Sequence, residues 1–128
     1  MTKQIISTPN APAPIGPYNQ AVLVNGNTLY TSGQIALNPA TMELELSSIE
    51  AETTLVMENM KAVLAAAEMT FEHVVKTSIF ISDMNNFSRI NEVYGNYFED
   101  NTAPARETVE VACLPKNVNV EISMIAIK

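Results

Sequence analysis

The last third of the chain alternates apolar and polar residues with a period of two, and this pattern constrains the fold most. Because successive side chains of a β-strand point to opposite faces of a sheet, residues 106–112 and 119–127 each predict a strand with one apolar face. The link Leu114-Pro115-Lys116-Asn117 is short enough to fold these strands back as an antiparallel pair. We expect both apolar faces to lie under helices, which leaves Arg106 and Glu121 together on the far side of the sheet.

A hairpin and an extended loop are expected in the first quarter of the chain. Asn25-Gly26 lies between two β-rich runs, and both residues tolerate the positive φ of a type I′ turn, so residues 21–32 predict a β-hairpin. Residues 9–17 contain too much proline for a helix or a central strand, which predicts an ordered, extended loop. A loose terminal tail is the alternative interpretation.

Two amphipathic helices are expected in the middle of the chain, on either side of a central strand. Apolar residues recur at helical spacing from Ile49 to Ala67, and Ser47-Ser48-Ile49-Glu50 has the spacing of a capping box. The opposite, polar face of this helix is expected to carry Glu52, Glu58, Asn59 and Lys61. Residues 74–82 are β-branched and aromatic and predict the central strand, and an apolar stripe from Phe87 onward predicts the second helix.

The charge of the chain argues against nucleic acid as a partner. Seven Lys and Arg stand against fourteen Asp and Glu, for a formal net charge of -7, and the basic residues are scattered singly. The start of the chain lacks a signal-peptide pattern and no apolar run approaches the ~18 residues of a membrane span, so we expect a cytoplasmic protein with no membrane partner.

The length of 128 residues suits a single domain, residues 1–128. Cys113 and His73 are the only cysteine and the only histidine. They give too few soft ligands for a structural zinc site, so we expect no metal.

Arg106 and Glu121 are the candidates for chemistry. Arg106 begins a strand beside a turn, where its fork of donors suits a planar carboxylate. A salt bridge from Arg106 to Glu110 or Glu121 is an equally good interpretation of the spacing. Glu121 is either a carboxylate that positions a water and moves a proton, or a simple charge partner for Arg106. No phosphate loop, dinucleotide fingerprint or nucleophile elbow is present.

The face of the last strand that carries Glu121 also carries Ile125 and Ile127. A free surface would be more uniformly polar, so this face predicts packing against copies of the same chain. An ordinary half-solvated antiparallel sheet is the alternative interpretation.

Several short motifs occur in a characteristic order along the whole chain. They are Ala13-Pro14-Ile15-Gly16-Pro17-Tyr18, Thr31-Ser32-Gly33-Gln34-Ile35, Asn38-Pro39, Val75-Lys76-Thr77, Pro104-Ala105-Arg106, Val109-Glu110-Val111-Ala112, Leu114-Pro115-Lys116 and Val120-Glu121-Ile122. Together they resemble the pattern of the RidA group of enamine/imine deaminases, in the Rid/YjgF family.

The resemblance implies an α+β fold and an assembly. It implies a single sheet of about six mostly antiparallel strands with two helices on one face, which is chorismate-mutase-like. Three copies would form a homotrimer around a central barrel, with three sites at the subunit interfaces.

The resemblance also implies a reaction without a cofactor. Family members hydrolyse reactive 2-aminoacrylate and 2-aminocrotonate to 2-keto acids and ammonia, and so protect pyridoxal-phosphate enzymes. Carried over by position, Arg106 would bind the carboxylate of the imino or keto acid, and Glu121 would orient or activate the attacking water. Tyr18, Ser32, Gly33 and Asn91 match positions that line the family's pocket, and Thr108 would add a small polar group on the Arg106 face.

The chain departs from the family pattern after Arg106. Glu107 and Thr108 stand where many members have a small residue and a cysteine, so a mechanism that needs a pocket thiol is in doubt. Glu107 is expected to point away from Arg106 if the strand is regular. Three other functions stay open: a sensor that binds 2-keto acids without turnover, a ribonuclease or translation inhibitor, and an inert family member kept for protein interaction.

Overall fold

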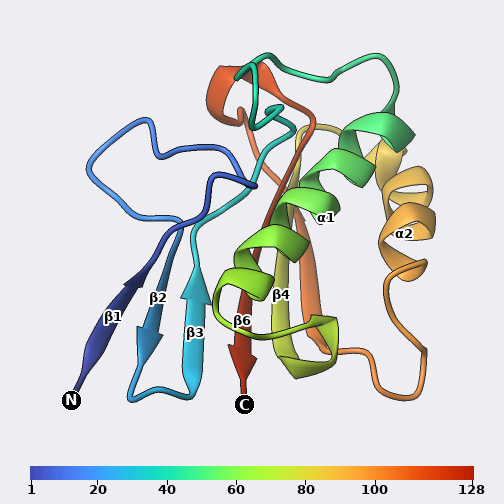
Figure 1. The fold of residues 1–128 in the computed structure, drawn as a ribbon. Helices are drawn as coiled ribbons and strands as arrows, with labels where there is room; N and C mark the ends of the chain where they lie inside the picture. Colours follow the sequence, from blue (N-terminus) through green and yellow to red (C-terminus); the bar gives the residue numbers. More distant parts are fainter.

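The computed structural model describes residues 1–128 as one six-stranded sheet with two helices on one face (Figure 1). The elements are β1 (Lys3–Ile6), β2 (Ala21–Val24), β3 (Thr28–Thr31), α1 (Ile49–Ala66), β4 (Val74–Ile81), α2 (Phe87–Gly95), β5 (Ala105–Glu110) and β6 (Val120–Ile127). The strand order is β1-β2-β3-β6-β4-β5, and every neighbouring pair is antiparallel except β4 and β5. The expected fold class is confirmed, although no sequence pattern predicted β1.

The hairpin of β2 and β3 is confirmed. Asn25 and Gly26 have φ values of 52° and 71°, and the N–H of Asn27 donates to the carbonyl of Val24 at 3.2 Å, as in a type I′ turn. β3 then pairs with β6, so the hairpin extends the main sheet.

The proline-rich run is a loop that one buried side chain ties to the sheet. Gln20 donates its amide to the carbonyls of Thr8, Ala11 and Pro12 at 3.0, 3.1 and 2.9 Å, and its Oε1 accepts from the N–H of Thr8 at 2.7 Å. These four bonds give partners to backbone groups of a segment that pairs with no strand.

α1 differs from the prediction in its cap and in its polar face. Its N-cap is Ser48, which accepts from the N–H of Ala51 at 3.0 Å, so the predicted box between Ser47 and Glu50 is wrong. Glu52 and Asn59 are only 0% and 1% exposed, not solvated as expected. Neighbouring loops and the start of β6 cover their side of the helix, which the spacing of apolar residues does not reveal.

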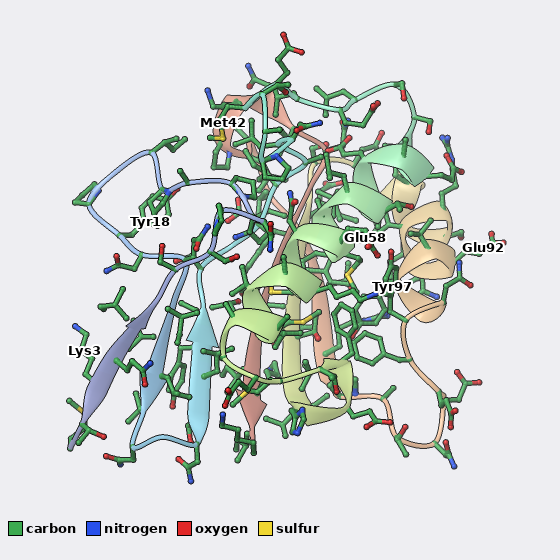
Figure 2. All side chains as sticks on the ribbon, viewed as in Figure 1. Lys3, Tyr18, Met42, Glu58, Glu92 and Tyr97 are labelled. Atoms are coloured by element: carbon green, nitrogen blue, oxygen red, sulfur yellow. The ribbon has the colours of Figure 1, made fainter.

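Two contacts hold α2 against α1. Arg89 donates to both carboxylate oxygens of Glu50, at 2.8 and 2.6 Å, and this bond lowers the pKa of Glu50 to about 2. Tyr97, just beyond α2, donates its hydroxyl to Glu58 at 2.7 Å, and the two side chains lie together between the helices (Figure 2). α2 is thereby fixed against α1.

The last two strands are not neighbours, which contradicts the predicted pair. β4 lies between them, parallel to β5 and antiparallel to β6. A parallel pair requires a crossover, and the segment containing α2 supplies it, which places β5 at the free edge of β4.

The main core fills the space between the sheet and the helices, and it includes Ile122 and Met124 of β6 as predicted. The other face of the sheet carries large exposed apolar side chains. They are Ile5, Tyr30, Val109 and Ile127. Val109 was expected under a helix, and the prediction for β5 is therefore wrong. Neither helix has the combination of length and hydropathy that crossing a bilayer requires.

Candidate active site

Arg106 lies half-buried against α2, on the helix-bearing face of the sheet. Its Nη1 donates to Oδ1 of Asn91 at 2.7 Å, and its Cζ lies 5.8 Å from the ring centroid of Phe87 and 5.1 Å from that of Tyr94. Phe87, Asn91 and Tyr94 follow one another at i, i+4 and i+7, so they share one face of the helix. One amide and two aromatic rings therefore hold the guanidinium in place.

The charge of Arg106 has no acidic partner. Arg106 takes part in none of the three ion pairs of the chain, and its Nε and Nη2 make no hydrogen bond. The alternative of a salt bridge to Glu110 or Glu121 is wrong, because Glu110 accepts instead from the backbone N–H of Met84 at 2.7 Å. A planar cation with free donors is suited to a carboxylate.

Glu107 points away from Arg106, as expected for a regular strand. It forms an ion pair with Lys76, with Nζ and Oε1 2.7 Å apart, and accepts from the hydroxyl of Ser78. Both contacts lower the pKa of Glu107, and the contact with Lys76 has the larger effect. Glu107 therefore does not compete for the guanidinium of Arg106.

Thr108 follows Arg106 on the same side of β5. Its Oγ1 is buried and has no hydrogen-bond partner in the chain. On β4, the strand that pairs with β5, Thr77 accepts a hydrogen bond from the hydroxyl of Tyr94 at 3.0 Å, and burial raises the pKa of Tyr94. The hydroxyl of Thr108 is thus free to form a hydrogen bond, and it lies two residues from Arg106 on the same side of β5. A buried polar atom without a hydrogen-bond partner costs free energy, so a ligand that bonded to it would be favoured.

A pocket of about 310 Å³ lies elsewhere, between the proline-rich loop and the start of β6. Its lining residues are Pro12, Ala13, Ile15, Tyr18, Gln20, Ser32, Gly33, Gln34, Ile35, Leu37, Pro115 and Glu121. The pocket therefore gathers four of the predicted residues: Tyr18, Ser32, Gly33 and Glu121. Glu121 is the only charged side chain in the lining.

Glu121 lies directly over Gly33. A Cβ built on Gly33 would come within 2.1 Å of Oε1 of Glu121 and 2.8 Å of its carboxyl carbon, so no other residue type leaves room for this carboxylate. Glu121 makes no side-chain hydrogen bond or ion pair, and burial raises its pKa. A carboxylate of this kind is suited to taking up a proton.

Ser32 and Tyr18 complete the rim of the pocket. The hydroxyl of Ser32 donates to the carbonyl of Asn19 at 2.5 Å, which leaves its lone pairs free. The hydroxyl of Tyr18 accepts from the N–H of Ile15 at 3.4 Å, and its side chain lies on the N-terminal loop, away from α2 (Figure 2).

The sheet separates Arg106 from Glu121. Arg106 pairs with Thr77 and Glu121 pairs with Phe80, and these partners lie three positions apart on β4. Because side chains alternate along a strand, Arg106 and Glu121 point to opposite faces, about 10 Å apart along β4 and about 10 Å across the sheet. The expectation that they lie together on the far side is therefore wrong within one chain.

Some contributors could not be identified from the sequence pattern. Phe87 and Tyr94 read as ordinary core residues, although their spacing around Asn91 is a signal that could have linked them to Arg106. Gln20 and Pro115 carry no comparable signal, because loop contacts bring them to the pocket. No group of three His, Cys, Asp or Glu side chains lies close enough to hold a metal ion.

The model of the family described as Endoribonuclease L-PSP matches residues 8–128. A RutC family protein from Synechocystis is 52% identical over 128 residues, covering 99% of this chain and 98% of the relative. A 2-iminobutanoate/2-iminopropanoate deaminase from Dermatophagoides farinae is 50% identical over 125 residues, covering 98% of this chain and 96% of the relative.

Solved structures share the fold. A Rid family protein of unknown function from Yersinia pestis superposes with a TM-score of 0.94 at 49% identity, over 99% of this chain and 100% of that chain. TdcF from E. coli, solved with bound serine, gives a TM-score of 0.90 at 41% identity, over 98% of each chain.

Proposed function

Because the chain belongs to the Rid family, we propose that it hydrolyses reactive 2-imino acids to 2-keto acids and ammonia. The substrates would be the imines of 2-aminoacrylate and 2-aminocrotonate. The observation that carries the proposal is Arg106, a held guanidinium with free donors and no acidic partner. A serine bound to the similar TdcF supports a small ligand with a carboxylate.

The chemistry needs little from the protein. The carboxylate of the imino acid binds Arg106, and the oxygen of a water molecule attacks the imine carbon while Glu121 takes up a proton from that water. The C=N bond becomes a C–N bond, and the same carboxyl group returns a proton to nitrogen. Glu121 then takes the proton of the new hydroxyl group and passes it to nitrogen, so the C–N bond breaks, ammonia leaves and the C=O bond forms. The atoms balance without an oxidant, a reductant or a cofactor.

Two copies of the chain are required to bring these groups together. Arg106 and Glu121 lie on opposite faces of one sheet, and neither has a partner of opposite charge in its own chain. In the proposed homotrimer, the Arg106 region of one copy closes the Glu121 pocket of the next. The apolar, helix-free face supports such an assembly, since Tyr30 and Ile127 expose about half of their surface there, 50% and 45%.

A sensor and a ribonuclease are the rival functions. A sensor would use the same carboxylate site without turnover, so a rate measurement separates it from the deaminase. The description of the family model names an endoribonuclease, but the net charge of -7 and the scattered basic residues disfavour binding of RNA.

The test follows release of pyruvate and 2-oxobutyrate from imines that a serine/threonine dehydratase generates in situ, in competition with semicarbazide. We expect the wild type to divert imine to keto acid, and Arg106→Lys to lose roughly 100-fold in kcat/KM, because lysine keeps the charge but lacks the planar fork.

Arg89→Lys is the matched control, since Arg89 is the only other arginine and binds Glu50 on the surface. It should keep wild-type activity. A folded wild-type protein that gives no acceleration over buffer with either imine would refute the deaminase and favour the sensor.

A further inference from the structure

Glu52 is the only charged residue of the chain that is fully buried, with 0% of its surface exposed. Glu52 lies in the first turn of α1, and its side chain reaches the start of β6, which is distant in the sequence. Its Oε2 accepts from the backbone N–H of Asn119 at 2.7 Å and of Val120 at 3.2 Å, and its Oε1 accepts from the side-chain amide of Asn119 at 2.7 Å. Three donors thus converge on one carboxylate.

These donors come directly before Glu121 in the chain. Just after Glu121, Ile122 exchanges two backbone hydrogen bonds with Gln34, at 2.8 and 3.1 Å. The backbone at position 121 is therefore clamped on both sides, by Glu52 before it and by Gln34 after it.

The side chain of Glu121 has no clamp of its own. It makes no hydrogen bond and no ion pair, and it rests on Gly33 in a space that admits no Cβ. The position of its carboxylate is consequently set by the backbone that carries it. A shift of about 1 Å in such a group is enough to cost on the order of 100-fold in rate.

We infer that Glu52 is a positioning residue for the site: it fixes the start of β6 and thereby holds the Glu121 carboxylate over Gly33. This inference rests on the proposed function for its kinetic readout. It assigns Glu52 no contact with substrate, since its three bonds all go to residues 119 and 120.

Two substitutions separate positioning from mere burial. Glu52→Leu removes every acceptor, so the N–H groups of Asn119 and Val120 lose their partner. We expect kcat to fall by about 10-fold to 100-fold with KM changed less than about 3-fold. Glu52→Gln keeps one oxygen toward the backbone N–H groups, and the amide of Asn119 can turn to match it, so kcat should stay within about 3-fold of the wild type.

Val63→Ala is the control for lost stability. Val63 is also fully buried and lies on the same helix, eleven residues and about 16 Å further along α1. It should lower the Tm and leave kcat unchanged. If Glu52→Leu does not fold, Asn119→Ala removes one of the three donors and should lower kcat about 3-fold.

Titration of the Glu121 carboxyl carbon by NMR gives a readout that does not need turnover. Glu52→Leu should lower the pKa of Glu121 toward its ordinary value, because the released carboxyl group becomes more exposed, whereas Glu52→Gln should not. A wild type that is inactive but shows this pattern would refute the function and keep the positioning role. Wild-type kcat and an unchanged Glu121 titration in Glu52→Leu would overturn the inference.

Discussion

Glu121 occupies the space that Gly33 leaves open. We predict that Gly33→Ala lowers kcat/KM by about 10-fold to 100-fold, because the new Cβ would meet three atoms of the Glu121 side chain between 2.1 and 2.9 Å and displace the carboxylate. The fold should survive, with a loss of less than about 1 kcal/mol in the free energy of unfolding, since a flexible side chain can move aside. Steady-state kinetics and a denaturant titration measure the two effects.

Gly95→Ala is the matched control for that substitution. A Cβ at Gly95 meets nothing within 4 Å, and the residue ends α2. Alanine there should keep full activity and stabilise the helix by up to about 1 kcal/mol. Equal loss of activity in both variants would show that the Glu121 contact is not the cause.

Glu121 also gives a prediction with a definite sign in pH. Burial raises its pKa, so the folded chain holds this proton to a higher pH than the unfolded chain does. Its contribution to stability is complete below the ordinary glutamate pKa and is lost as the pH rises through the raised value. Glu121→Gln cannot ionise, so its Tm should exceed that of the wild type at neutral pH and match it in acid.

The same variant should be inactive, because the amide takes up no proton. Wild-type activity should fall as the pH decreases through the raised pKa, with the acidic limb above the ordinary glutamate range. Thermal melts and kcat/KM from pH 4 to 8 test both statements. A wild type that gains stability over Glu121→Gln as the pH rises would contradict the assigned environment.

The types of the site residues could be predicted from the sequence, but their relative placement could not. Period-two alternation shows which residues of β5 share a face, yet it does not say which face of β5 belongs with which face of β6. The register of each strand against β4 decides that, and it separates Arg106 from Glu121. Pairing with β4 is a long-range contact that no local pattern encodes.

At the scale of elements, local signals were sufficient where the element is defined by its own residues. The Asn25-Gly26 turn fixed the hairpin, and apolar spacing fixed α1. Buried polar side chains of α1 were wrongly expected to be solvated, because their hydrogen-bond partners are distant in sequence. Asn59, for example, donates to the carbonyls of Ile35 and Leu37 at 3.3 and 2.9 Å. A polar residue on a helix reads as solvated unless the loop that covers it is known.

Gln20 is the buried polar residue that holds the loop lining the pocket. We predict that Gln20→Ala lowers the free energy of unfolding by roughly 1 to 3 kcal/mol, because loss of the four hydrogen bonds of Gln20 leaves backbone groups without partners. Hydrogen exchange of residues 8–18 should accelerate at the same time. Gln4→Ala, an exposed glutamine on β1, is the control and should change neither quantity. Unchanged exchange in Gln20→Ala would show that the loop is held by other contacts.

At the scale of the whole molecule, one chain presents two separate candidate regions and an apolar face that no helix covers. Arg106 lies against α2, and Glu121 lies in the pocket beside the N-terminal loop. Exposed apolar side chains of β3, β5 and β6 lie on the helix-free face. In the proposed homotrimer, a closed ring of copies would cover that face and repeat the same junction at every interface, so each junction would join one region of each kind.

Mixed trimers of Arg106→Ala and Glu121→Gln test this account most directly. The two variants are co-expressed with different affinity tags, purified through both tags in turn and assayed for imine hydrolysis, beside each variant alone. Each variant alone should be inactive, whereas any mixed trimer has one junction that joins an intact Arg106 to an intact Glu121, so it should recover about a third of wild-type activity. Complete inactivity of mixed trimers whose composition has been verified by mass spectrometry would contradict a site shared between copies.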